Sequence, residues 1–252
     1  MRKEASTYCI AVIIAGAFGL LLRWLQCSMI FQEGSDLALA GSPVSYLMAI
    51  VMVAVPVVLW RFTRRTGIAG ATKEPDIALA RPIAAISVLL VVASLVAALG
   101  AVLLFFQTGN MQLKLVALLG LLAAPVLMLY PSLPGWGMVG TVFSLLPVAF
   151  YAMWMVVIYK ENAVNPVLWS FVVQILAVAA GMYALFHMSA YLFFSAKPRK
   201  ALFACGLATI YGMIALADNT LLSVKLLFGG WSVALVVLCW VLVMNIPEPE
   251  EK

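Results

Sequence analysis

The chain has 252 residues, of which 65% are hydrophobic and only 10% are charged. Soluble domains carry roughly 45–50% apolar and about 25% charged residues, so this composition excludes an ordinary soluble fold. The net charge of +5 does not indicate a nucleic-acid-binding protein, because the basic residues lie at the ends of apolar runs, where they orient helices and meet lipid headgroups. The lipid bilayer is therefore the expected partner.

Eight apolar segments approach the roughly 20 residues that a helix needs to cross a bilayer. They are long and lack the two-residue alternation of barrel strands. We therefore expect an all-α, polytopic transmembrane helix bundle that forms a single domain over 1–252, without a soluble domain. Seven helices are the alternative, because only three polar residues interrupt the last two segments. The segments are 8–31, 45–62, 83–106, 112–130, 137–159, 166–195, 201–218 and 222–245.

The first segment has some features of a signal peptide, since Arg2 and Lys3 precede an apolar run. The sequence Ala38-Leu39-Ala40 is typical of a cleavage site, but it lies well beyond that run. A signal peptidase site normally follows the apolar region closely. We therefore expect a first helix that is retained in the membrane.

The distribution of basic residues predicts the orientation, because cytoplasmic loops are enriched in Lys and Arg. With eight helices and both termini in the cytoplasm, the inner side holds eleven basic residues and the outer side three. The inner set is Arg2, Lys3, Arg61, Arg64, Arg65, Lys73, Arg81, Lys197, Arg199, Lys200 and Lys252, and the outer set is Lys114, Lys160 and Lys225. The cell membrane is the expected location.

Prolines mark two further features of the chain. Pro131 and Pro134 lie within five residues that also include Gly135, which predicts a tight turn between the segments 112–130 and 137–159. Pro147 lies inside the segment 137–159 and is expected to kink that helix, because proline removes a backbone hydrogen bond. Such a kink is either absorbed by packing or lines a cavity beside Tyr151.

Arg23 is the most informative polar residue, since a charged side chain inside a transmembrane helix is costly and usually faces the bundle interior. Gly16, Gly19, Arg23 and Gln26 share one face at helical spacing. Small residues on that face favour close helix packing. The candidate ion-pair partners of Arg23 are Glu33, Asp36 and Asp218. An ion pair is the simpler interpretation, and contact with an anionic solute is the alternative.

Three other residues are candidates for ligand-facing or intramembrane polar positions. His187 is the single histidine of the chain, and we expect it to hydrogen-bond between helices rather than to relay protons. Gln174 lies on another face of the same segment, and Tyr151 belongs to the segment that contains Pro147. The four cysteines form no CxxC pair, so neither a disulfide framework nor a metal site is expected.

The first helix and the loop after it carry a resemblance to a known group. The stretch from Leu22 to Gln26, together with Phe31-Gln32-Glu33 and Gly41-Ser42-Pro43, resembles uncharacterised multi-pass membrane proteins of anaerobic Gram-positive bacteria. The similarity extends over about 25 residues. It implies a bacterial inner membrane and brings no activity with it.

Two functional hypotheses follow. The first is a small-solute transporter or membrane-embedded solute-binding subunit, in which a cavity reaches Arg23, Gln26 or Tyr151. The second is a non-catalytic scaffold or accessory subunit that acts through helix contacts with a membrane partner or in a homo-oligomer. The sequence contains no HExxH, GxSxG or Walker motif, so we expect neither an enzyme nor a cofactor.

Overall fold

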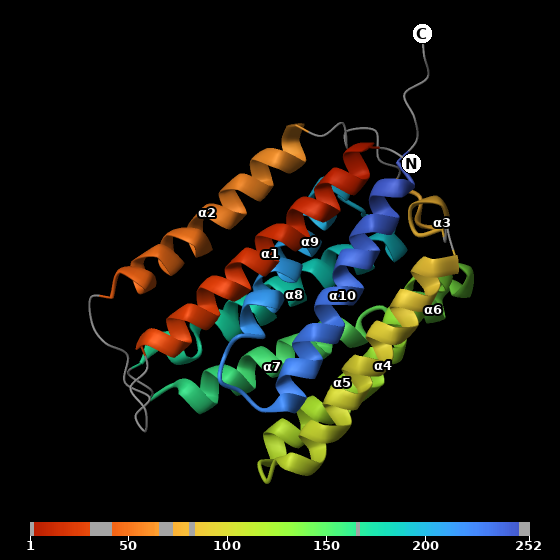
Figure 1. Ribbon diagram of the computed structural model, residues 1–252. Coiled ribbons are helices and arrows are strands. Elements are labelled where there is room, and N and C mark those ends of the chain that lie inside the picture. The colour runs from red at the N-terminus through yellow and green to blue at the C-terminus, as the bar shows by residue number, and fades with distance from the viewer. Residues whose placement is uncertain (1–2, 31–41, 66–72, 81–83, 165–166, 247–252) are drawn as a thin grey trace.

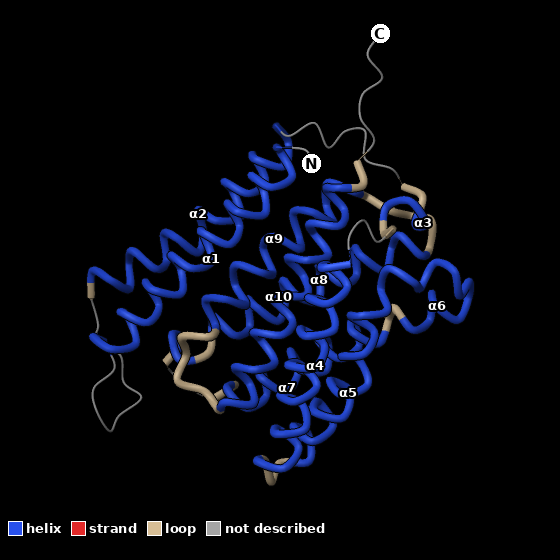
Figure 2. Tube along the Cα trace, turned by 45° about the vertical axis from the view of Figure 1, so that its right-hand side comes forward, coloured by secondary structure: helices blue, strands red, loops and turns tan. Residues whose placement is uncertain are grey.

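The computed structural model describes residues 3–30, 42–65, 73–80, 84–164 and 167–246. Every regular element in these ranges is helical, as Figures 1 and 2 show. The long helices are α1 (Lys3–Ile30), α2 (Pro43–Arg65), α4 (Ala84–Gln107), α5 (Met111–Leu129), α7 (Leu146–Asn162), α8 (Val172–Leu192), α9 (Pro198–Ala215) and α10 (Leu222–Met244). The short elements are α3 (Pro75–Ala78), α6 (Gly137–Phe143) and two 3₁₀ helices, Tyr130–Trp136 and Leu168–Ser170.

Six helical segments of the described chain are long and apolar enough to cross a membrane. One of them is the continuous stretch Met111–Asn162, which contains α5, α6 and α7. Helix α9 is not among the six; it has 18 residues, and Arg199 and Lys200 lie in its first turn. The prediction of an all-helical chain with several membrane-length helices is confirmed, whereas eight crossings and the orientation stay predictions.

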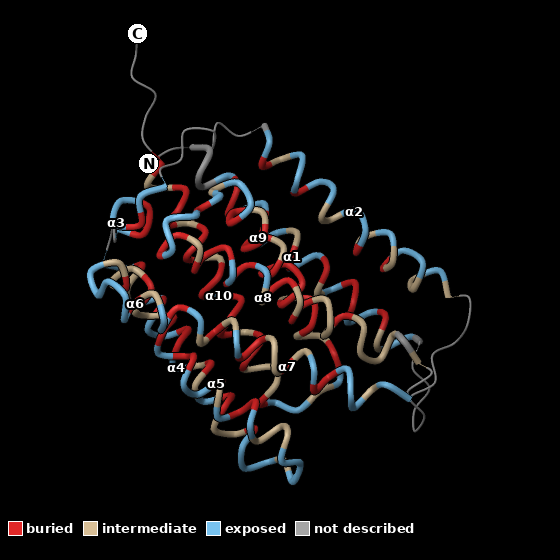
Figure 3. The backbone as a smooth tube through the Cα atoms, turned by 180° about the vertical axis from the view of Figure 1, so that it is seen from behind, coloured by how far each residue is buried: buried red, intermediate tan, exposed pale blue. Residues whose placement is uncertain are grey.

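Helix α10 forms the centre of the bundle and α2 its periphery. In the apolar stretch of α10, 72% of the residues are buried, whereas in that of α2 only 17% are. Figure 3 shows the same contrast, with α2 exposed along its outer side. The start of α1 and the end of α10 lie on the same side of the bundle (Figure 1). The amide of Asn245, just after α10, donates to the carbonyl oxygens of Ala78 and Ala80 beside α3.

The predicted helix 137–159 is wrong as a continuous element. It breaks after Phe143, and α7 begins at Leu146 with Pro147 in its first turn. Proline is well tolerated in a first turn, where its missing N–H would have no partner anyway. Seven residues of α6 rise only about 10 Å, so α6 does not cross a bilayer.

Side chains from neighbouring segments hold the break in place. The hydroxyl of Ser189 on α8 donates to the carbonyl oxygen of Ser144 at 2.8 Å. Because that proton is used, Tyr130 is the donor in its 3.2 Å contact with Ser189. All three residues are buried, so this chain of hydrogen bonds satisfies polar groups that lipid could not. The expected turn at Pro131–Gly135 is the 3₁₀ helix Tyr130–Trp136.

Helices α4 and α10 approach each other closely at two glycines. A Cβ atom added to Gly230 would lie 2.7 Å from the carbonyl oxygen of Ala93 and 2.7 Å from the backbone nitrogen of Ala97. On the other side of the contact, a Cβ on Gly100 would lie 2.8 Å from the backbone nitrogen of Leu227. Small residues of this kind let two helix backbones approach closely in a membrane.

We predict that Gly230→Ala lowers the free energy of unfolding by about 1–3 kcal/mol, the usual cost of overpacking. The obstacle is backbone of α4, which cannot rotate away as a side chain can. Gly109→Ala is the matched control, because nothing lies within 4 Å of a Cβ added there. Thermal unfolding in detergent micelles measures both variants, and equal midpoints for Gly230→Ala and Gly109→Ala would contradict the packing described.

Candidate functional site

The polar face of α1 lies inside the bundle, against α9. Gly16, Gly19, Arg23 and Gln26 are all buried. A Cβ added to Gly19 would lie 2.7 Å from the side chain of Ile214 on α9. A Cβ added to Gly16 would likewise collide with the side chain of Met213 on α9. The two glycines therefore let α1 approach α9 closely, and the next positions along the face carry Arg23 and Gln26 to the end of α9.

Arg23 is 1% exposed and forms an ion pair with Asp218. Its Nε donates to Oδ1 of Asp218 at 2.6 Å, one N–H of Nη1 reaches Oε1 of Gln26 at 2.6 Å, and Nη2 donates to the carbonyl oxygen of Trp169 at 2.6 Å. The amide of Gln26 donates in turn to the hydroxyl of Ser45 on α2 at 3.2 Å. The guanidinium thus joins α1 directly to two other parts of the bundle, and Gln26 joins it to a third, α2.

Each partner comes from a point where a helix starts or ends. Asp218 lies in the turn between α9 and α10, outside both helices. Trp169 belongs to the 3₁₀ helix that precedes α8, and Ser45 lies in the first turn of α2. Because backbone groups at such ends lack helical partners, the carbonyl of Trp169 is free to accept from Arg23, whereas Asp218 and Ser45 take part through their side chains. We call Arg23, Gln26, Asp218, Trp169 and Ser45 the arginine network.

The carboxylate of Asp218 has hydrogen-bonding capacity that the arginine network does not use. Burial raises its pKa, and the charge and hydrogen bond of Arg23 oppose that rise. A weaker polar contact with Gln174 on α8 acts in the same direction as Arg23. Oδ2 of Asp218 has no hydrogen-bond partner among the described residues. The hydroxyl oxygens of Thr220 and Ser223 are likewise buried without a partner there.

The other candidate residues lie in different surroundings. Tyr151 packs in an aromatic cluster of the core, with ring centroids 5.1 Å from Phe150 and 5.2 Å from Trp231. His187 contacts Tyr183 edge to face at 4.5 Å between centroids. Neither residue is part of the arginine network. Glu33 and Asp36 lie outside the described residues.

Two members of the arginine network could not be chosen from the sequence. Trp169 contributes its backbone carbonyl, and a carbonyl carries no sequence signal because every residue has one. Ser45 is one of many serines close to helix ends. Among the described residues, no group of three or more His, Cys, Asp or Glu could hold a metal ion.

Comparison with known proteins found no matching family model, no matching curated protein and no matching solved structure.

We predict that Asp218→Asn lowers the free energy of unfolding by about 3–5 kcal/mol, because it leaves the Arg23 charge buried without its counter-ion. Asn219→Ala, at the exposed neighbouring position, is the control and should change stability by less than about 0.5 kcal/mol. Equilibrium unfolding in mixed micelles provides the measurement. If Asp218→Asn unfolds like the parent protein, the ion pair does not hold the helices together.

A second variant tests the geometry of the guanidinium rather than its charge. Arg23→Lys keeps the positive charge, but a single ammonium cannot reproduce the planar fork that reaches Asp218, Gln26 and Trp169 at once. We expect a loss of about 1–3 kcal/mol, in the range of a hydrogen bond to a charged group. Ser28→Ala serves as the control, since Ser28 is exposed and its hydroxyl donates to the carbonyl of Leu25 within α1. Full stability of Arg23→Lys would show that charge alone suffices.

Proposed function

We propose that this protein is a non-catalytic subunit of the bacterial cell membrane that acts through helix contacts, as a scaffold or accessory component of a larger membrane assembly. The observation that carries the proposal is the Arg23–Asp218 ion pair. The guanidinium is paired with a carboxylate and bonded to Gln26 and Trp169, so its charge is already neutralised within the chain. A residue used in this way stabilises the bundle instead of receiving an anionic solute.

The aromatic core supports the same proposal. Phe150 stacks on Trp231 at 5.3 Å, and Trp154 stacks on Phe228 at 4.7 Å between ring centroids. All four side chains are at most 2% exposed. Tyr151, the residue expected beside a cavity under the transport hypothesis, is packed among them. We place both chain ends in the cytoplasm, as the basic residues predict.

The proposal is tested by extracting the protein from its own membrane in polymer-bounded lipid discs and measuring its mass. We expect a particle that contains a second protein, or further copies of this chain, in fixed stoichiometry. The variant that carries Arg23→Leu and Asp218→Leu together should form the same particle once folded, because the pair has no chemical role. A monomer with nothing bound would contradict the proposal.

A small-solute-binding subunit is the second candidate function, and one observation favours it. Oδ2 of Asp218 and the hydroxyl oxygens of Thr220 and Ser223 are buried and unpartnered among the described residues. Leaving such groups without hydrogen bonds is costly, and a small polar solute with N–H or O–H donors would satisfy them. Under this candidate, solute recognition uses Asp218 and Ser223, not the guanidinium.

A thermal-shift screen of polar solutes in detergent tests the second candidate. A solute present at 100 times its dissociation constant stabilises the folded state by about 2.7 kcal/mol, which is easily measured as a raised midpoint. Ser223→Ala should abolish that rise, while Ser28→Ala keeps it. If no amine, alcohol or amide raises the midpoint, the second candidate is wrong and the scaffold proposal is unaffected.

A further inference from the structure

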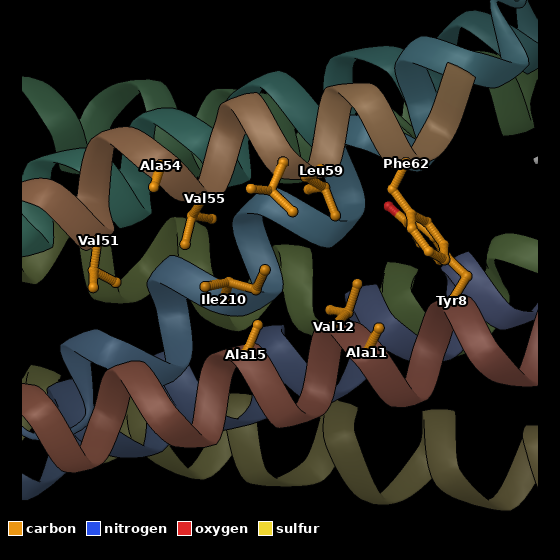
Figure 4. A pocket seen from close by; sticks show the side chains of 11 residues that line it. Tyr8, Ala11, Val12, Ala15, Val51, Ala54, Val55, Leu59, Phe62 and Ile210 are labelled. Atoms are coloured by element: carbon orange, nitrogen blue, oxygen red, sulfur yellow. The ribbon is translucent and has the colours of Figure 1, made fainter. Parts of the chain in front are cut away.

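An apolar groove of about 260 Å³ runs between α1 and α2. Figure 4 shows Val51, Val55 and Leu59 projecting from α2 toward Val12 and Ala15 of α1. Ile210 of α9 lies behind them and forms the floor. At one end the groove is closed by Phe62 of α2 and Tyr8 of α1, whose ring centroids are 5.7 Å apart.

The groove offers no free polar group to an occupant. All lining residues are aliphatic or aromatic, and the hydroxyl of Tyr8 is the single side-chain polar group among them. That hydroxyl donates to the carbonyl oxygen of Leu202 at 2.9 Å, so its proton is used. An occupant must therefore be a hydrocarbon, because burying a polar group here would leave it without a hydrogen bond.

The length of the groove matches one leaflet of a bilayer. Its lining extends from Val51 to Phe62 along α2, which corresponds to about 16 Å at the helical rise. Half of the hydrocarbon layer is about 15 Å thick. A single acyl chain from the leaflet on the side where α1 begins would therefore lie along the groove over most of its length.

Basic side chains lie at the Phe62 end of the groove. Arg61 and Arg64 are exposed in the last turns of α2, and the guanidinium of Arg64 lies 3.8 Å from the ring centroid of Trp60. The first turn of α9 adds the exposed Arg199 and Lys200. Four exposed basic residues thus lie at this end of α2 and α9, and Arg61 shares a face of α2 with Ala54 and Val58, which line the groove.

The register of α2 against α9 places these two basic groups at the same level. The hydroxyl of Tyr211 on α9 donates to the carbonyl oxygen of Met52 at 2.7 Å. One to two turns along, a Cβ on Gly206 would lie 3.2 Å from Leu59. The two helices therefore run antiparallel, and continuing the same register brings Arg64 level with Lys200.

From these contacts we propose that the groove between α1 and α2 retains an anionic phospholipid. One acyl chain lies between Val55, Val12 and Ile210, and the phosphate is held by Arg61, with Arg64 and Lys200 adding positive charge at the same level. Clusters of Lys and Arg at a membrane surface attract anionic headgroups. The inference is independent of the scaffold and solute-binding proposals, since it involves neither Arg23 nor Asp218.

Native mass spectrometry of the full chain, delipidated and then incubated with phosphatidylglycerol or phosphatidylcholine of identical acyl chains, tests this proposal. We expect one bound phosphatidylglycerol with an affinity about tenfold or more above that for phosphatidylcholine, given the contribution of each nearby basic residue. Replacing Arg61 and Arg64 together by glutamine should remove the preference. Replacing Lys114 and Lys160 by glutamine, at the far ends of other helices, should not.

A groove-filling variant separates a retained lipid from lipid that merely surrounds the protein. Ala54→Trp places a ring in the groove and should lose the bound phosphatidylglycerol, whereas Val53→Trp, at the neighbouring exposed position of α2, should keep it. The proposal would be overturned if the two lipids bound equally well and neither variant changed their binding. So would a dimer that Ala54→Trp dissociates without changing lipid binding, because the occupant would then be a second copy of the chain.

Discussion

A guanidinium cannot be left alone in the interior of a membrane protein. The charge of Arg23 would be far too costly to bury without a counter-ion, so the fold must bring a carboxylate to it. Asp218 meets this requirement from a position 195 residues further along the chain. Its place between α9 and α10 fixes how the end of α1 sits against those helices. The glycines on the same face of α1 make the approach possible, because they let the α1 and α9 backbones come close enough for the pair to form.

Buried polar groups must find their partners within the protein, and the same requirement explains the break between α6 and α7. Pro147 lies in the first turn of α7, where its missing N–H needs no helical partner. The carbonyl of Ser144 is then bonded by Ser189, which Tyr130 supports. The interior that results is made of aromatic rings and paired polar groups around α10. Helix α2 stays outside this core and meets it chiefly through α1 and α9, which leaves the apolar groove along its inner side.

Much of the helical layout could be predicted from apolar length alone. The expected segment 222–245 corresponds to α10 at Leu222–Met244, and 83–106 to α4 at Ala84–Gln107. Residue spacing also placed Gly16, Gly19, Arg23 and Gln26 on one face, and that face is buried. The break at Ser144 could not be predicted. The sequence does not show whether a proline will kink a helix or break it, because the outcome depends on whether distant residues bond to the backbone carbonyl that is left free. Nor could Trp169 be foreseen in the arginine network, since it contributes only backbone. Among three candidate acids, the choice of Asp218 depended on how α9 and α10 pack.

The central claim is that Arg23 and Asp218 neutralise each other as a structural pair. A double-mutant cycle with leucine at each position measures this directly, by equilibrium unfolding of the parent, Arg23→Leu, Asp218→Leu and the double variant in the same micelles. The account predicts a coupling free energy of about 2 kcal/mol or more, within the range for residues in direct contact, with the double variant more stable than either single one. Additive losses, with a coupling near zero, would contradict it.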